Sequence, residues 1–195
     1  MPLAPRLAAI LLLVLSAPLL LLTALVVRVG LGRPILFRQR RSGLHGVPFA
    51  MIKFRTMTSE RDTAGQLLPD EQRVPPLGRL LRRLRLDELP ELLNIARGEM
   101  AFVGPRPLLP ETVAAMGHKG QRRGTVRPGL TGWAQVSGNT LLSDAEKLDL
   151  DLWYVSHRTV WLDTAILLRT PLMLLLGERR HSRRLATAQA EGGWR

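Results

Sequence analysis

The longest hydrophobic run lies at the start of the chain, where residues 7–27 carry no charged side chain. About 20 apolar residues suffice to cross a bilayer, so the run predicts a membrane segment. It fits a cleaved signal peptide, a spanning helix, or a helix that bends and returns to the same face. Its length exceeds the ~7–15 residues of a signal-peptide core. Pro18 removes a backbone hydrogen bond in mid-run and Ser16 is placed to satisfy a freed group, which favours the bent form.

Basic residues follow this run closely, whereas its N-terminal flank has only Arg6. Because positive charge is retained on the cytoplasmic side, the C-terminal end of the run is expected there. A spanning helix would place Arg6 outside, and a re-entrant helix would keep both ends inside. The basic residues are Arg28, Arg33, Arg38, Arg40 and Arg41.

Two apolar stretches around a glycine-containing segment at 42–46 predict a β-hairpin over residues 34–57. Side chains alternate across a strand, so Ile52 and Phe54 face one way while Lys53 and Arg55 face the other. The two cations either belong to a solvated surface or form a pair that faces phosphate.

Helical periodicity resumes after a polar, turn-rich stretch at 58–76 that ends in two prolines. Leucines at 77, 80, 81 and 84 predict an amphipathic helix with a basic outer face. Such a helix lies either on an anionic membrane surface or on an ordinary protein surface.

An adjacent acid pair, Asp87 and Glu88, follows directly. Since Pro90 is tolerated only in the first turn of a helix, a helix is expected to begin near Asp87 and to stop at Gly98. Asp87 would then be an N-cap. A cap needs one acid, however, and Glu88 and a further glutamate are also present. Two neighbouring carboxylates can instead divide the roles of nucleophile and Mg²⁺ ligand.

The second half of the chain is punctuated by proline and glycine before it becomes helical again. Prolines on both sides of Arg106 fix a loop suited to a phosphate contact. Arg127 precedes a glycine-rich run, 128–138, in which tight turns near a ligand are expected. Ser143 opens a helix through about residue 157 with a capping box. Residues 159–176 predict an interfacial or core helix, and 177–195 a basic, disordered tail.

The composition narrows the class of partner. The formal net charge of +12 indicates a polyanionic partner. The protein is also apolar, with 46% hydrophobic residues. Aromatic residues make up only 5%, which argues against a single-stranded nucleic-acid binder, and no nucleic-acid partner is expected. The absence of cysteine excludes thiol chemistry, and the four histidines show no metal-ligand spacing.

Five ordered motifs carry a family resemblance. They are KFRTM at 53–57, LDELPELLN at 86–94, GEMAFVGPRP at 98–107, RPGLTGWAQVSG at 127–138 and DLWYV at 151–155. Together they closely resemble the bacterial sugar transferase family, the small monotopic phosphoglycosyl transferases. The resemblance runs from the apolar segment to about residue 170.

The resemblance implies transfer of a sugar 1-phosphate from a UDP-sugar to polyprenyl phosphate, with release of UMP, as the first membrane step of glycoconjugate synthesis. It implies an aspartyl-phosphosugar intermediate with Asp87 as nucleophile, Glu88 as the Mg²⁺ partner and Arg106 on phosphate. Arg82 matches a basic position of the family. Further matches to the site are Lys53, Arg55, Arg127, Gln135 and Asp151.

The expected fold is α+β, mainly α with a small β-hairpin, in a monotopic protein of the inner membrane. It divides into a re-entrant helix at 1–30, a catalytic domain on the cytoplasmic face at 31–176 and the tail. Its partners are UDP-sugar, polyprenyl phosphate and membrane lipids, and its cofactor is Mg²⁺. A membrane-anchored binder of nucleic acid or anionic lipid, and an inactive scaffold, remain as alternatives; neither uses the acid pair.

Three departures from the family pattern stand out. Ala17 separates Ser16 from Pro18, where the family commonly has Ser directly before Pro. Asn139 stands where many members have an arginine assigned to the site. Alanines occupy positions 8 and 9, near which an acidic residue is usual.

Overall fold

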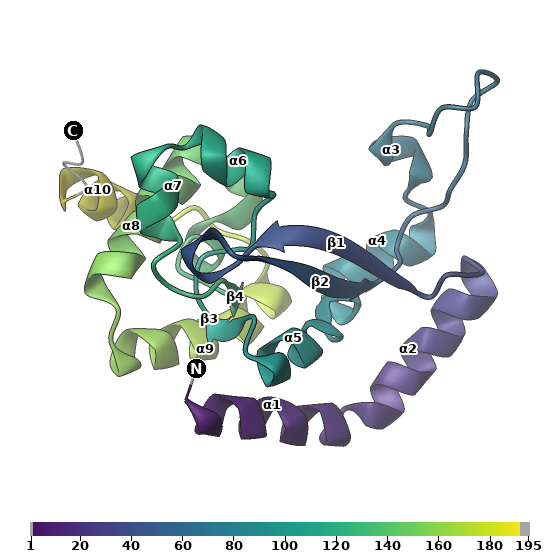
Figure 1. Ribbon diagram of the computed structural model, residues 1–195, viewed down its shortest axis with the longest axis horizontal. Helices are drawn as coiled ribbons and strands as arrows, with labels where there is room; N and C mark the ends of the chain where they lie inside the picture. The colour runs from purple at the N-terminus through teal and green to yellow at the C-terminus, as the bar shows by residue number, and fades with distance from the viewer. Residues whose placement is uncertain (1, 192–195) are drawn as a thin grey trace. The chain divides into compact units, whose positions relative to one another are not determined.

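The computed structural model describes residues 2–191, which are mainly helical with two small two-stranded sheets (Figure 1). The chain forms two compact units. The first comprises Met1–Gln39 and Met51–Ala96, and the second comprises Arg40–Ala50 and Arg97–Arg195. The mainly helical α+β class is as predicted. The N-terminal helices and the acid-pair segment fall in the same unit.

The apolar run forms two helices, α1 (Leu3–Leu15) and α2 (Ala17–Gly30), bent by 62°. At the bend Ser16 Oγ donates to the Leu12 carbonyl oxygen (2.6 Å), and Pro18 lies in the first turn of α2. The Leu12 carbonyl oxygen also accepts from the Ser16 N–H (2.8 Å), so the hydroxyl adds a bond within α1 at the bend. Ala17 is accommodated as the first residue of α2. No described helix has by itself the length and apolar content to cross a membrane; the bent pair passes that test jointly.

The predicted hairpin is formed by β1 (Leu36–Ser42) and β2 (Pro48–Phe54), joined by the 3₁₀ turn η1 (Leu44–Gly46). Ile52 and Phe54 are buried, as their alternation predicts. In the first unit Phe54 packs with Val27 of α2 and Leu81 of α4 (Pro76–Arg83). Of the predicted leucine stripe, Leu81 and Leu77 face this core, whereas Leu80 and Leu84 are exposed. The arginines at 79, 82 and 83 are exposed as predicted.

The predicted helix from Asp87 to Gly98 is wrong at its start. The segment instead forms a 3₁₀ turn, η2 (Leu86–Glu88), and then the helix α5 (Glu91–Arg97). Pro90 has no N–H to donate, so the ladder of α-helical bonds begins only after it. The turn before it is closed by tighter bonds, such as Glu88 N–H to the Arg85 carbonyl oxygen (3.2 Å). The predicted stop at Gly98 is confirmed by its φ of 82°.

The second unit contains a sheet that the sequence did not predict. Strands β3 (Ala101–Val103) and β4 (Gly129–Thr131) run parallel, with Ala101 opposite Gly129. Around them lie α6 (Pro110–Ala115), α7 (His118–Arg123) and the 3₁₀ turns η3 (Gln135–Ser137) and η4 (Asn139–Leu141). In the first unit, the polar stretch at 58–76 contains one short described helix, α3 (Asp70–Arg73).

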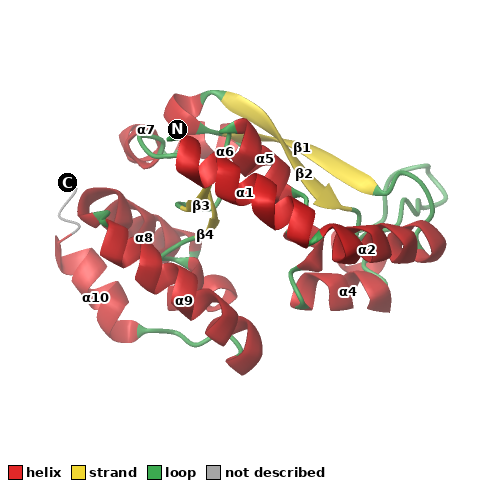
Figure 2. Ribbon diagram, turned by 90° about the horizontal axis from the view of Figure 1, so that it is seen from below, coloured by secondary structure: helices red, strands yellow, loops and turns green. Residues whose placement is uncertain are grey.

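The unit ends in α8 (Asp144–His157), α9 (Val160–Leu176) and α10 (Ser182–Glu191). The predicted capping box of Ser143 and Glu146 is present at the start of α8. Helix α10 lies beside α8 (Figure 2) and buries Leu185 and Ala188 in the main core cluster of the unit. A disordered tail is therefore wrong for Ser182–Glu191, because two apolar residues at i, i+3 spacing face the core. Residues 192–195 lie outside the described part.

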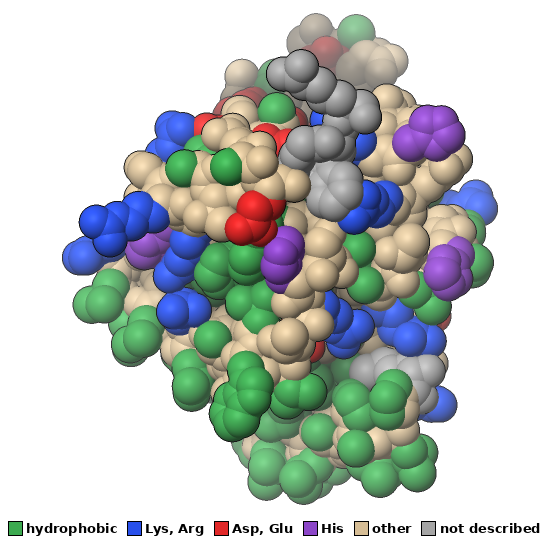
Figure 3. Space-filling model, turned by 90° about the vertical axis from the view of Figure 1, so that its left-hand side faces the viewer, with side chains coloured by type: hydrophobic (Ala, Val, Ile, Leu, Met, Phe, Trp, Pro, Cys, Tyr) green, Lys and Arg blue, Asp and Glu red, His purple; other side chains and the backbone are tan. Residues whose placement is uncertain are grey.

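Helix α9 exposes many apolar side chains although it contains Asp163, Arg169 and Pro171. Val160 and Trp161 at its start are 80% and 84% exposed. Exposed hydrophobic side chains also gather on the face drawn in Figure 3, with lysine and arginine side chains next to them. Only Ile166 of α9 is fully buried, so the helix is peripheral rather than central to the core.

Candidate active site

The acid pair is buried in the first unit. Asp87 and Glu88 are both 7% exposed and lie within η2. The backbone reaches this turn through Arg85, which has a left-handed conformation (φ 55°, ψ 20°). Asp87 lies inside η2 and not at the residue that precedes α5, so the N-cap interpretation of Asp87 is wrong. Burial of two adjacent acids without a capping role is typical of a chemical site rather than of a helix terminus.

Both oxygens of Glu88 are paired with cations. Lys53 Nζ lies 3.0 Å from Oε1, and Arg85 Nη1 lies 3.0 Å from Oε2. Lys53 also lies 3.0 Å from Oε1 of Glu91, a buried acid of α5 that the sequence reasoning did not assign to the site. The shared lysine joins strand β2 to both acidic elements and fixes their spacing.

Asp87 differs from Glu88 in its surroundings. Its Oδ1 is buried and has no hydrogen-bond partner among the described residues. Burial foremost, and then the charge of Glu88, raise the pKa of Asp87 above its usual value, while Lys53 and Arg82 oppose the rise. An unsolvated, unpartnered carboxylate oxygen is a stronger nucleophile than a hydrated one once it is ionised.

The remaining predicted residues of the first unit contact protein groups. Lys53 pairs with the carboxylates described above. Arg55 is buried, and its guanidinium donates to the Leu31 carbonyl oxygen, so the solvated-surface interpretation is wrong for it. Arg82 is exposed and its Nε donates to the Thr56 hydroxyl (2.9 Å). The structure therefore brings Lys53 and Arg82 to the acids, where they act on the pKa of Asp87.

In the second unit the β3–β4 pairing brings together the two loops that carry Arg106 and Arg127. Arg127 Nε donates to the Gly98 carbonyl oxygen (2.9 Å), which ties the loop before β4 to the segment before β3. The loops approach so closely that a Cβ on Gly104 would lie 2.3 Å from the Arg127 carbonyl oxygen. The glycines thus permit backbone to meet backbone, rather than only a ligand.

Asp151 belongs to a buried ion pair. Its Oδ2 accepts from Arg123 Nε at 2.8 Å, and both side chains are 6% exposed. The same guanidinium donates through Nη2 to the carbonyl oxygen of Arg106. Asp151 therefore acts on the Arg106 loop through Arg123. Sequence reasoning missed Arg123 because it lies in a basic, glycine-containing stretch with no spacing that marks it.

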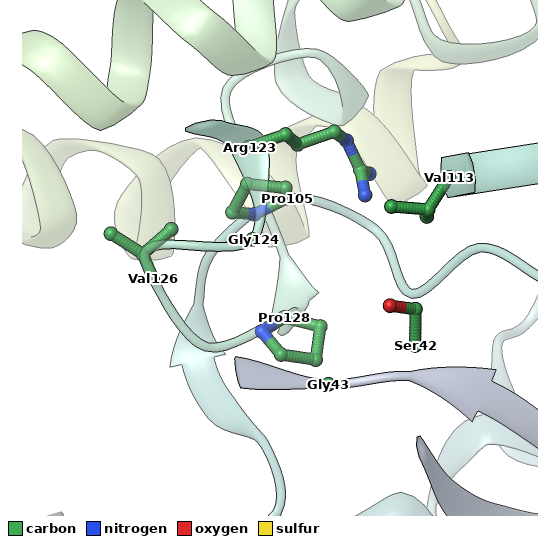
Figure 4. A pocket seen from close by; sticks show the side chains of 8 residues that line it. All are labelled: Ser42, Gly43, Pro105, Val113, Arg123, Gly124, Val126 and Pro128. Atoms are coloured by element: carbon green, nitrogen blue, oxygen red, sulfur yellow. The ribbon is translucent and has the colours of Figure 1, made fainter. Parts of the chain in front are cut away.

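Arg123 also lines a small pocket of ≈ 10 Å³, about the room of one water molecule. The close-up in Figure 4 shows Pro105 and Pro128 within it, together with Ser42 of the hairpin. Both prolines are neighbours of the predicted arginines, Arg106 and Arg127. The loops are thus braced by rigid residues on their inner side. The full lining is Ser42, Gly43, Pro105, Val113, Arg123, Gly124, Val126 and Pro128.

Gln135 is buried in η3, and its amide Nε2 donates to the Leu130 carbonyl oxygen (3.2 Å). Its Oε1 has no partner among the described residues, which leaves one acceptor available. Asn139 has a φ of 44° and donates to Glu178, so an asparagine suits this left-handed position. The nine predicted residues therefore form two sets, one in each unit.

The donor set bears on the expected Mg²⁺. The described residues contain no group of three histidine, cysteine, aspartate or glutamate side chains placed to hold a metal ion. Mg²⁺ in phosphate chemistry commonly takes only one or two protein carboxylates and draws its other ligands from phosphate and water. Asp87 has an unpartnered oxygen for such a contact, whereas both oxygens of Glu88 are paired with Lys53 and Arg85, so Mg²⁺ at Glu88 requires one of these ion pairs to open.

Comparisons with known proteins show which family the chain resembles. The family model described as bacterial sugar transferase matches residues 3–177. The chain is 48% identical over 171 residues to the uncharacterized sugar transferase EpsL of Bacillus subtilis, covering 88% of this chain and 85% of that protein. It is 41% identical over 186 residues to the UDP-glucose:undecaprenyl-phosphate glucose-1-phosphate transferase of Caulobacter vibrioides, covering 86% and 67%.

A third relative is much longer. The undecaprenyl-phosphate glucose phosphotransferase of Komagataeibacter xylinus is 41% identical over 177 residues, which cover 84% of this chain but only 33% of that protein. The motifs, the buried acid pair and the match over most of the chain agree. The chain belongs to the bacterial sugar transferase family.

Proposed function

We propose that the protein transfers a sugar 1-phosphate from a UDP-sugar to polyprenyl phosphate, and so begins the synthesis of a membrane-linked glycan. The names of two relatives, from Caulobacter vibrioides and Komagataeibacter xylinus, describe undecaprenyl phosphate as the acceptor of a glucose phosphate. The observation that carries the proposal for this chain is the buried, unpartnered Oδ1 of Asp87 beside a Glu88 that cations already neutralise.

The reaction divides into two displacements at one phosphorus. Asp87 Oδ1 forms a bond to the β-phosphorus of the UDP-sugar, and the bond from that phosphorus to the bridging oxygen breaks, so that UMP leaves with the electron pair. An oxygen of polyprenyl phosphate then attacks the aspartyl-phosphosugar. The bond to Asp87 breaks, and the carboxylate is restored. Displacement at a diphosphate needs neutralisation of charge more than proton transfer, which suits a site rich in arginine and lysine.

Each residue has a stated task in this scheme. Glu88 would hold Mg²⁺, which when bound neutralises phosphate charge. Lys53 and Arg82 lower the pKa of Asp87 and so favour its ionised, attacking form. The Arg106 loop, held through Arg123, presents a guanidinium suited to phosphate, and Arg127 ties its own loop to the segment before β3. Water is kept from Asp87 by burial, which protects the covalent intermediate from hydrolysis.

We also propose that the protein is monotopic in the inner membrane, with its catalytic part on the cytoplasmic face. A lipid-linked acceptor requires a site at the interface. The 62° bend at Ser16 is compatible with a re-entrant helix, and the exposed apolar side chains of α9 suit an interfacial position. A cysteine introduced at Ala4 should then be labelled only from the cytoplasmic side; labelling from outside the cell would contradict the re-entrant form.

The transfer itself is tested by UMP release from a panel of UDP-sugars, with polyprenyl phosphate, in membranes that contain the protein. Replacement Asp87→Asn should abolish UMP release. Asp144→Asn removes an acid that is 93% exposed and serves as the matched control, with activity near wild type. Substantial turnover by Asp87→Asn would refute the assignment of the nucleophile.

A further inference from the structure

Arg85 has an unusual backbone for its residue type. Its φ of 55° and ψ of 20° lie in the left-handed region, which side chains other than glycine and asparagine rarely occupy. Residues held in such conformations concentrate at functional sites, where the surrounding structure maintains them. The position lies between α4 and η2, two residues before Asp87.

From this position the guanidinium contacts one member of the acid pair, Glu88. Arg85 Nη1 lies 3.0 Å from Oε2 of Glu88, whose other oxygen Lys53 already neutralises. The arginine is therefore a second cation on one carboxylate. Its side chain is 20% exposed, whereas that of Glu88 is 8% exposed, so the guanidinium has the more open surroundings of the two.

The guanidinium has capacity beyond this contact. Arginine carries five N–H donors in a planar fork that matches phosphate oxygens. Within the part of the chain that the structure describes, Glu88 is the one side chain that pairs with Arg85. The remaining donors belong to a guanidinium that is held on Glu88, the residue next to Asp87 in the chain, which makes them suited to a phosphate of the substrate.

We propose that Arg85 binds the sugar-bearing β-phosphate of the nucleotide donor while it remains anchored to Glu88. The anchor holds the fork at a fixed angle to Asp87, so that the phosphorus is presented to Oδ1. This inference rests on the proposed function and adds to it a substrate contact on the phosphate that is transferred. The ligand class is a nucleoside diphosphate, and a nucleoside monophosphate lacks the phosphate that Arg85 binds.

The test is the binding of UDP and of UMP to the full-length protein, measured by calorimetry, for wild type, Arg85→Gly and Arg85→Lys. Loss of a charge-assisted contact should raise the Kd for UDP about tenfold in Arg85→Gly, whereas the Kd for UMP changes by less than about twofold. Glycine accepts the left-handed backbone, so the replacement adds no backbone strain. Lysine keeps the charge without the fork and should give an intermediate Kd for UDP.

Arg83→Ala is the matched control, because it removes one exposed arginine of the same segment and should leave both Kd values unchanged. An unchanged Kd for UDP in Arg85→Gly would overturn the inference and leave Arg85 as a partner of Glu88 alone. Equal weakening of UDP and UMP would also overturn it, since that indicates a general loss of the site. Failure of the wild type to bind UDP or to release UMP from any UDP-sugar would instead refute the proposed function.

Discussion

The buried pair of Asp151 and Arg123 offers the most direct test of how the second unit holds its arginine loop. Replacement Asp151→Asn keeps the shape of the side chain but removes its charge and leaves the guanidinium uncompensated. Breaking one partner of a buried pair costs about 3–5 kcal/mol. A domain of this length loses roughly 2–4 °C in Tm for each kcal/mol, so the midpoint should fall by about 6–20 °C.

A double replacement separates stability from loop positioning. Burial raises the pKa of Asp151 even though Arg123 opposes the rise, so the ionised carboxylate is costly in this site. Buried pairs exchanged for apolar residues of similar volume are often neutral or more stable. Asp151→Leu with Arg123→Met should therefore recover most of the lost Tm. Its UMP release should stay low, because the donor to the Arg106 carbonyl oxygen is absent.

The measurement is a thermal melt of the purified, detergent-solubilised protein beside UMP release from the same preparation. The exposed pair of Asp144 and Lys147 provides the control, since its loss is worth at most about 1 kcal/mol. If Asp151→Asn lowers Tm no more than Asp144→Asn does, the pair is not a structural anchor. If the double variant regains full activity, the positioning of Arg106 through Arg123 is refuted.

Three further predictions concern separate parts of the molecule. Burial raises the pKa of Asp87 and only its ionised form attacks, so kcat/KM for UMP release should fall as the pH falls through that raised pKa. Lys53→Met removes a positive charge that lowers the pKa of Asp87, so the acidic side of the pH profile should move to higher pH. An unchanged profile would count against the scheme. Leu185→Asp places a charge in the core beneath α10 and should cost at least ~3 kcal/mol in a denaturant titration, whereas a disordered tail would tolerate it. Gly104→Ala must displace the Arg127 carbonyl oxygen and should cost about 1–3 kcal/mol with loss of UMP release; wild-type behaviour would show that the loops need not approach so closely.

Local rules in the sequence were sufficient for several features in both units. The bend at Ser16, the hairpin around its glycine-containing turn and the capping box at Ser143 each depend on residues within a few positions. The position of the acid pair was identified correctly. Its backbone was not, because the effect of Pro90 on the turn before it competes with the apolar periodicity that continues through α5.

Features that depend on distant partners were not predictable in this way. Asp151 was placed in the site by resemblance, yet its immediate partner is Arg123, 28 residues away. The stretch that contains Arg123 reads as flexible because its glycines and charges have no periodicity. The tail reads as disordered because it is basic, and only the core beneath it shows why Leu185 and Ala188 are buried.

The charges around Asp87 explain why such a buried acid pair needs its neighbours. In the first unit three carboxylates, of Asp87, Glu88 and Glu91, face the cations Lys53, Arg82 and Arg85. The cluster is thus close to neutral before a substrate binds, which makes burial of the acids tolerable. A diphosphate adds negative charge that this balance does not cover. The proposed Mg²⁺ would supply the compensating charge at the phosphorus where Asp87 attacks, and the spare donors of Arg85 would hold the phosphate oxygens.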